Sequence, residues 1–171
     1  MLLSREAVER ITARRLAASQ ADGCIVHVSG SDKVNLRFAR NSATSNGARS
    51  GVSVTITSQY GQRSGSVTVN GLDEEALQAA QRRSEEIARQ TPPDPEQMPP
   101  PGPQSYPANI AYDEETAQAD TARLAEAART AIAAAEAHGV DAAGYAEAGG
   151  RFCAVANSAG LFAYERDSIA D

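Results

Sequence analysis

The sequence predicts an α+β fold in which three helices cover one face of a curved, mostly antiparallel sheet of six or seven strands. The first observation is the strict alternation of apolar and polar residues in three segments between Lys33 and Asn70, which gives a strand two different faces. The second is that the polar face carries small hydroxylated residues, as in antiparallel sheets with one face toward water. The third is helical spacing of apolar residues in three other segments.

Length and charge narrow the class of protein. The 171 residues fit one domain with a substantial core, and the formal net charge is −6. Nucleic-acid binding needs clustered Lys and Arg, whereas the basic residues here are scattered, so we expect no nucleic-acid partner. No apolar run approaches the roughly 20 residues that cross a bilayer, and the N-terminus lacks the apolar segment of a signal peptide. We therefore expect a cytoplasmic protein without a membrane partner.

The chain should begin with a helix followed by a hairpin. Ser4 is a suitable N-cap for a helix over residues 5–19. A strand is expected over residues 24–28, and the composition of residues 29–32 favours a tight turn. A second strand then runs from Lys33 into the Arg40–Ser42 segment.

Two further strands follow a polar segment that the sequence leaves ambiguous. Residues 41–51 are small and polar, so they form either a long loop or a continued edge strand. Strands are expected over residues 51–58 and 63–70, with a turn between them. Glycines, including Gly51 and Gly65, punctuate this region, and a glycine inside a strand often marks a bulge or a close backbone approach.

A second helix and a proline-rich spacer come next. Asp73 is a good N-cap, and Leu72 and Leu77 occupy the positions of a hydrophobic staple around it. All eight prolines lie between Pro92 and Pro107, so the helix should end there and the chain should become extended. Because this segment joins two helices and lacks flanking basic residues, a spacer is favoured over a ligand for an SH3-type domain.

The remainder predicts a third helix and three short strands. The helix should run from near Asp113 to His138, with Gly139 as its C-terminal signal. Strands are expected over residues 141–148, 152–156 and 161–164, separated by turns at residues 149–150 and 158–160.

The order of these elements indicates an internal duplication. A helix, a strand, a glycine-containing turn and a second strand occur in both halves, and the second strands end in Asn41-Ser42 and Asn157-Ser158. We interpret residues 1–171 as one α+β domain with two halves, 1–90 and 112–171, joined by the spacer 91–111. Chance similarity between two short units stays open as the alternative.

Few residues carry recognisable chemistry. His27 and His138 are the only histidines, and neither belongs to a His-Glu-x-x-His type of zinc helix. Cys24 and Cys153 lack a Cys-x-x-Cys context and are interpreted as reduced core thiols. Neither a Gly-x-Ser-x-Gly nucleophile turn nor a phosphate-binding Walker loop is present.

The acidic clusters have a structural interpretation. Residues 73–75 and 113–115 are both Asp-Glu-Glu, and carboxylates are favoured at the start of a helix. Capping is therefore preferred over catalysis, and we predict no catalytic residue and no metal ligand in this chain.

Several segments together resemble a known family. The segments RFARNSAT, GVSVTI and GSVTVN, followed by LDEEALQAAQRRSEEIARQTPPDP, resemble the N-terminal domain of TldD/PmbA proteins, also called the modulator-of-DNA-gyrase family. The later VANSAGLFAYERDS resembles the end of that domain. Each segment alone is only weakly specific for the family. Their order along the chain, with the proline-rich segment after the second helix, is more specific.

The resemblance implies a larger parent protein. Family members have a β-rich C-terminal domain, in which TldD-type chains hold zinc and cut unfolded peptides. PmbA-type chains lack the zinc helix and assemble with the TldD type, and the gyrase name reflects genetics. Because this sequence has none of the metal ligands and ends at Asp171, we expect an excised N-terminal domain without a cofactor of its own, with zinc belonging to the absent C-terminal domain. The sequence does not decide between the two types of parent.

The expected function is a non-catalytic part of a peptidase. The domain would form a wall of the substrate chamber and part of an interface with an identical or paralogous subunit. An unfolded peptide would add to the exposed strand edge between Arg40 and Gly51, and the candidate peptide-binding residues are Arg40, Asn41 and Ser42. Two alternatives stay open. One is a stand-alone interaction or assembly module, and the other is a small-molecule enzyme with Cys24 or Cys153 as its nucleophile.

Overall fold

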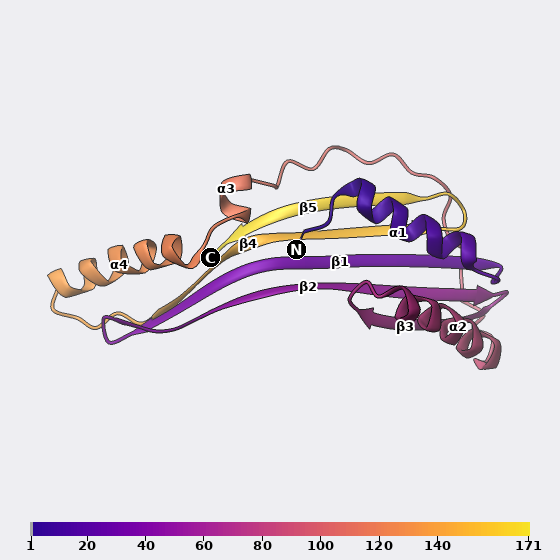
Figure 1. The fold of residues 1–171 in the computed structure, drawn as a ribbon, viewed down its shortest axis with the longest axis horizontal. Helices are drawn as coiled ribbons and strands as arrows, with labels where there is room; N and C mark the ends of the chain where they lie inside the picture. Colours follow the sequence, from indigo (N-terminus) through magenta and orange to yellow (C-terminus); the bar gives the residue numbers. More distant parts are fainter. Residues whose placement is uncertain (1) are drawn as a thin grey trace.

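Residues 2–171 are described by a computed structural model, and they form one five-stranded antiparallel sheet with the strand order β3-β2-β1-β4-β5 (Figure 1). The α+β class and the antiparallel sheet are confirmed. The strands are β1 (Gly23–Ala39), β2 (Ser42–Tyr60), β3 (Arg63–Asn70), β4 (Gly144–Asn157) and β5 (Phe162–Ala170). The helices are α1 (Arg5–Ala18), α2 (Glu74–Gln90), α3 (Glu114–Ala117) and α4 (Thr121–Ala137).

Strand β1 is continuous where the sequence predicts a turn. It spans 17 residues and pairs with β2 throughout, including through residues 29–32. The apolar residues on the two sides of this segment share one parity, as Val28 and Val34 illustrate. An unbroken strand therefore keeps both on the same face, and the predicted hairpin turn at this position was wrong.

The hairpin turn lies instead at Arg40–Asn41. These two residues have φ angles of 51° and 57°, which is the left-handed pair of a two-residue turn whose twist matches the flanking strands. Residues 42–51 belong to β2, so the continued edge strand is the alternative that the structure selects. A bulge between Arg37 and Phe38 shifts the pairing by one residue near the turn.

Strand β4 joins two segments that the sequence predicts as separate strands. Residues 149–150 lie within β4 and pair with both β1 and β5, so the predicted turn at this glycine pair was wrong. The turn between residues 157 and 162 is present. These two continuous strands reduce the predicted six or seven strands to five.

The first two helices begin where their capping residues predict. Ser4 Oγ accepts a hydrogen bond from the Ala7 amide at 3.3 Å, and the Asp73 carboxylate accepts one from Ala76 at 2.8 Å. Each carboxylate or hydroxyl satisfies an amide that the first helical turn leaves unpaired.

The predicted third helix is interrupted. Helix α3 ends at Ala117, and the Asp120 carboxylate caps α4 by accepting from the Arg123 amide at 2.9 Å. A second N-cap inside the segment starts a new helix, so residues 2–171 contain four helices and the predicted number of three was wrong. Gly139, with φ of 66°, ends α4 as expected.

The helices cover one face of the sheet. Val8 of α1 and Leu77 and Ala80 of α2 pack on a core that includes Val26 and Ile56. A second, smaller cluster is formed by Leu124 and Ala128 of α4 with Leu36 and Ala148. Every strand residue in these clusters belongs to the same face, and none of the helices in residues 2–171 packs on the other face.

The proline-rich spacer, residues 91–111, runs from the end of the β2–β3 hairpin to the outer edge of β5 (Figure 1). The Asp94 amide donates to the Gln62 carbonyl at 2.8 Å, and the Asn157 side chain donates to the Pro101 carbonyl at 2.8 Å. The spacer thus crosses the end of the sheet and holds to it by hydrogen bonds at several points.

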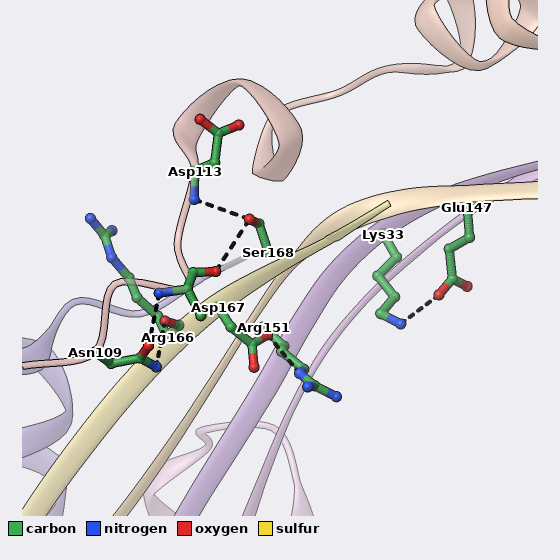
Figure 2. Close-up of polar contacts among 9 residues, drawn as sticks. Lys33, Asn109, Asp113, Glu147, Arg151, Arg166, Asp167 and Ser168 are labelled. Atoms are coloured by element: carbon green, nitrogen blue, oxygen red, sulfur yellow. Dashed lines mark hydrogen bonds and ion pairs between the residues drawn. The ribbon is translucent and has the colours of Figure 1, made fainter. Parts of the chain in front are cut away.

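At β5 the spacer binds like an added strand segment (Figure 2). The Ser168 amide donates to the Ala111 carbonyl at 3.0 Å, the Asn109 side chain donates to the Arg166 carbonyl at 3.3 Å, and the Asp113 amide donates to Ser168 Oγ at 3.0 Å. This part of the β5 edge is therefore covered by the chain itself.

The element order shows the helix-hairpin unit twice. Helix α1 is followed by the β1–β2 hairpin, and α4 is followed by the β4–β5 hairpin. The first strands of the two hairpins, β1 and β4, pair with each other in the middle of the sheet. Strands from the segments 1–90 and 112–171 therefore share one sheet.

Candidate functional site

A hollow of about 560 Å³ lies over the middle of the sheet, on the face without helices. Small side chains form its floor, because β1 carries Ser29 and Ser31 there and β2 carries Gly51. Charged side chains stand around them: Arg49, Arg151, Glu165 and Asp167. The predicted hydroxyl-rich, wetted face thus contains a shallow polar basin.

Most charges near this basin are paired. Arg151 binds Asp167 at 2.6 Å across the β4–β5 pair, and Lys33 binds Glu147 at 2.6 Å across the β1–β4 pair (Figure 2). The hydrogen bond from Lys33 lowers the pKa of Glu147 below its usual range, because it favours the charged carboxylate. Asp167 similarly raises the pKa of Arg151.

Toward the hairpin turn the same face carries one more cation. The Arg37 guanidinium lies over the Tyr145 ring at 5.5 Å from its centroid, and the Tyr145 hydroxyl donates to Glu147 at 2.9 Å. That bond raises the pKa of Tyr145, since ionisation of the phenol would remove the donor.

His27 and Cys153 meet on this face. His27 Nε2 lies 3.1 Å from Cys153 Sγ, and both side chains are half-buried. Burial raises the pKa of the Cys153 thiol, and the negative charge of Glu165 adds to that effect. The thiol therefore stays protonated at neutral pH, which makes it a slow nucleophile.

The second cysteine is deeper. Cys24 is fully buried beneath the helices, and its Sγ accepts a weak hydrogen bond from Gln81 Nε2 at 3.8 Å. Burial raises the pKa of this thiol as well. In both cysteines burial is the largest effect on the thiol pKa, and it opposes the thiolate form that a nucleophile needs.

Within residues 2–171, no group of three or more His, Cys, Asp and Glu side chains is arranged to hold a metal ion. The His27–Cys153 pair offers only two ligands, whereas a structural zinc site uses four and a catalytic one at least three. No step that uses zinc can be assigned to these residues. None of the helices in this part of the chain is long and apolar enough to cross a membrane.

The outer edge of β2 is open over the half that lies nearest the hairpin turn. Strand β3 pairs only with residues 53–60 of β2, so β1 is the only strand of residues 2–171 that pairs with the segment Ser42–Gly51. All of its residues except the partly buried Gly47 are exposed. We call this segment the open edge.

The backbone of the open edge alternates in direction. The Val52 carbonyl accepts from the Gly71 amide at 2.8 Å, so Val52 points its polar backbone groups away from β1. Successive residues point to opposite sides of a strand, and Ala48 and Asn46 share the parity of Val52. Their N–H and C=O groups are thus directed outward and can pair with an extended chain.

The three predicted peptide-binding residues lie at one end of the open edge. Asn41 is occupied by its own chain: its side chain donates to the Val140 carbonyl at 3.2 Å and accepts from the Ala142 amide at 2.7 Å. This ties the hairpin turn to the loop after α4. Arg40 in the turn and Ser42 at the start of β2 are exposed.

Arg49 was not among the residues predicted to bind peptide; it lies at the other end of the open edge and lines the basin. Neither Arg49 nor Arg40 forms an ion pair within residues 2–171. A signal existed in the sequence, because the 40 residues from Lys33 to Leu72 contain five of the 16 basic residues and none of the 22 acidic ones. The overall negative charge concealed this local basic segment.

The fold has close matches among solved structures. The crystal structure of TldE from Thermococcus kodakarensis superposes with a TM-score of 0.79 at 20% identity, covering 96% of this chain and 37% of that protein. The chain has the fold of part of TldE. The family resemblance predicted from the sequence is thereby confirmed at the level of the fold.

Two proposed modulators of DNA gyrase also share this fold. The protein from Thermotoga maritima superposes with a TM-score of 0.81 at 11% identity, and the match covers 95% of this chain and 38% of that protein. The protein from Bacteroides thetaiotaomicron superposes with a TM-score of 0.77 at 15% identity, and the match covers 99% of this chain and 40% of that protein. This chain therefore spans about two-fifths of the length of each. No protein-family model and no curated protein matches the sequence.

Proposed function

We propose that this chain is the non-catalytic, peptide-holding domain of a TldD/PmbA-type peptidase that acts on unfolded polypeptides in the cytoplasm. In that assembly it forms one wall of the substrate chamber and part of the contact with an identical or paralogous subunit. The zinc and the bond-breaking residues belong to a further domain of the assembled protein.

The observation that carries the proposal is the open edge of β2. An extended peptide that adds to a sheet edge is held mainly by main-chain hydrogen bonds, with little demand on its side chains. That mode suits unfolded substrates of varied sequence. The outward groups of Ala48 and Asn46, and the small exposed side chains around them, present such an edge.

Fold likeness supports the family context. All three similar structures cover at least 95% of this chain, so nearly all of it has the fold of one portion of those longer proteins. The names TldE and modulator of DNA gyrase describe those three proteins. For this chain, a role in a peptidase assembly is our proposal.

A stand-alone interaction module is the second candidate. The same open edge favours it, because strand addition also joins folded partners. The two candidates differ in what the edge accepts: a peptide-holding domain binds unfolded chains of many sequences, whereas an assembly module binds one folded partner.

Two assays test the proposal. Binding of fluorescein-labelled unfolded peptides to the chain, followed by fluorescence anisotropy, should give saturable curves for several unrelated sequences. Incubation of unfolded casein with the chain and added zinc should give no cleavage. Clear turnover would refute the non-catalytic role, and failure of every unfolded peptide to bind would refute peptide holding.

The proposed subunit contact has its own test. Light scattering coupled to size exclusion should detect a dimer of the chain, or a complex with a paralogous subunit that is expressed with it. A chain that stays monomeric with both candidates would contradict the interface.

A further inference from the structure

We propose that the open edge of β2 selects acidic extended segments, binding them as an added strand between Arg40 and Arg49, which form no ion pair among residues 2–171. The proposal rests on the peptide-holding function proposed above and adds to it a chemical class of substrate. It follows from the direction of the backbone groups, the charges along the strand and the contrast with the other edges of the sheet.

The length of the open edge suits a segment of about ten residues. Ser42–Gly51 spans roughly 33 Å at about 3.3 Å per residue. The outward N–H and C=O groups of Ala48 and Asn46 offer two donors and two acceptors to a bound strand. An incoming backbone in strand conformation satisfies both kinds of group at once.

The molecule already uses this mode on its opposite edge. Around Ala111 the spacer lies along β5, and the Ser168 amide donates a backbone hydrogen bond of 3.0 Å to the Ala111 carbonyl. The edge of β5 is therefore occupied in part by the chain's own extended segment, whereas no strand of residues 2–171 pairs with β2 over Ser42–Gly51.

Charge identifies the occupant. The surrounding hairpins carry five basic residues and no acidic residue from Lys33 to Leu72, although the whole chain has a net charge of −6. Lys33 is neutralised by Glu147 and Arg37 lies over the Tyr145 ring. Arg40 and Arg49 are left without an ion pair among residues 2–171, and opposite charges on neighbouring strands attract.

The same charges disfavour a second copy of this chain as the occupant. Pairing of two open edges would bring four arginines into one short interface with no carboxylate from either edge, and like charges opposite each other are destabilising. Charged edge residues are one way in which proteins prevent sheet edges from pairing with themselves. A negatively charged strand removes that repulsion.

Side-chain pockets add little selectivity here. The open edge consists otherwise of small residues, as in Ala43, Thr44 and Ser45. Charge is therefore the main property by which this edge distinguishes one extended segment from another. Such attraction between exposed groups weakens as salt screens it.

The test uses three fluorescein-labelled decapeptides and fluorescence anisotropy with the 171-residue chain. One peptide alternates Glu and Thr, one alternates Lys and Thr, and one is the Glu-Thr peptide with every backbone nitrogen methylated, which keeps the charge but lacks the backbone donors of a strand. Each is titrated at about 50 mM and about 300 mM salt, which span weak and strong screening.

Three variants locate the binding. A48P removes an outward N–H without breaking the pairing with β1, and Pro is tolerated at strand edges. The double variant R40E/R49E reverses the two unpaired charges. R82E is the matched control, because Arg82 is exposed on α2, away from the edge. Circular dichroism confirms that each variant is folded.

The Glu-Thr peptide should bind the wild-type chain about tenfold more tightly than the Lys-Thr peptide at low salt, as expected for two exposed charge pairs. A48P should abolish binding, R40E/R49E should reverse the preference, and R82E should change neither.

Equal affinity for the Glu-Thr and Lys-Thr peptides, still abolished by A48P, would overturn the acidic preference and leave the peptide-holding function intact. Undiminished binding to A48P, or equal binding of the N-methylated peptide, would overturn strand addition at this edge. Absence of binding by all three peptides would overturn the peptide-holding function itself.

Discussion

Helix α2 and strand β3 approach so closely at Gly65 that the position has no room for a side chain. A Cβ atom at Gly65 would lie 2.5 Å from both the Ala88 nitrogen and the Ser84 carbonyl oxygen, and 2.8 Å from Ile87 Cβ. Two of these contacts are with helix backbone, which cannot rotate away. We therefore predict that Gly65→Ala is destabilising.

The size of the effect follows from the displacement. Ordinary contacts begin near 3.4 Å, so α2 would have to move by about 1 Å. Overpacking of this kind costs about 1–3 kcal/mol, and the value should lie near the upper end because Leu77 and Ala80 hold α2 in the core. Alanine also reduces the conformational entropy of the unfolded chain, which offsets about 0.5 kcal/mol of this loss of stability.

The net expectation is a loss of about 2–2.5 kcal/mol in the free energy of unfolding. For a domain of this length that corresponds to a fall in Tm of roughly 5–10 °C. Urea unfolding followed by circular dichroism measures the loss, with an unchanged slope against denaturant if the folded and unfolded states keep their surface areas.

Gly51→Ala provides the matched control. Gly51 also lies within a strand, but no atom lies within 4 Å of its added Cβ and its φ is not positive. The change should leave stability unaltered or raise it by up to about 1 kcal/mol. If Gly65→Ala unfolds within about 0.5 kcal/mol of Gly51→Ala, the close approach of α2 to β3 is wrong.

Three other predictions concern the open face and the hairpin turn. Asn41→Ala should lower the free energy of unfolding by about 1–2 kcal/mol, because it removes two hydrogen bonds to the loop after α4 and places alanine at a φ of 57°. Ser42→Ala should leave that free energy unchanged, and urea unfolding measures both variants. Equal effects of the two changes would contradict a stabilising role of the Asn41 hydrogen bonds. A double-mutant cycle of Lys33→Ala and Glu147→Ala should give a coupling of about 0.5–1 kcal/mol at pH 7. Since the folded pKa of Glu147 is lowered, this coupling is complete above the unfolded pKa and should be lost as pH falls from about 5 toward 3; a pH-independent coupling would refute it. Cys153 should react with iodoacetamide more slowly than free cysteine at pH 7.5, and faster as pH rises, because its pKa is raised; a rate at or above that of free cysteine would indicate an activated thiol.

The sequence predicts the local elements well wherever a local cause exists. Ser4 and Asp73 start helices at the expected positions because capping depends on residues three apart. Strand glycines such as Gly51 and Gly65 were expected to mark a bulge or a close backbone approach; Gly65 meets α2 in this way, whereas an added Cβ at Gly51 has no atom within 4 Å.

The strand number was wrong because composition was given more weight than parity. Residues 29–32 and Gly149–Gly150 look like turns by composition, yet each continues a strand that pairs on both sides. Tertiary pairing overrides the turn preference of single residues. The actual turn at Arg40–Asn41 lacks the glycine that usually marks it.

The candidate site was predicted in outline only. The exposed edge beginning near Arg40 was expected, but its use of Asn41 to hold the loop after α4 depends on a contact between residues 101 positions apart. Such contacts are absent from local patterns. The basic character of the segment around Arg49 was present in the sequence and was hidden by the net charge of −6.

The central claim is that the open edge of β2 holds an extended peptide. Amide hydrogen exchange tests this claim most directly. In the free chain the outward amides of Ala48 and Asn46 should exchange rapidly, because no strand of residues 2–171 pairs with them. A saturating concentration of the Glu-Thr decapeptide should slow both by at least about tenfold, the factor for an amide that is protected nine-tenths of the time. Full occupancy of the peptide with no protection at either amide would contradict the account.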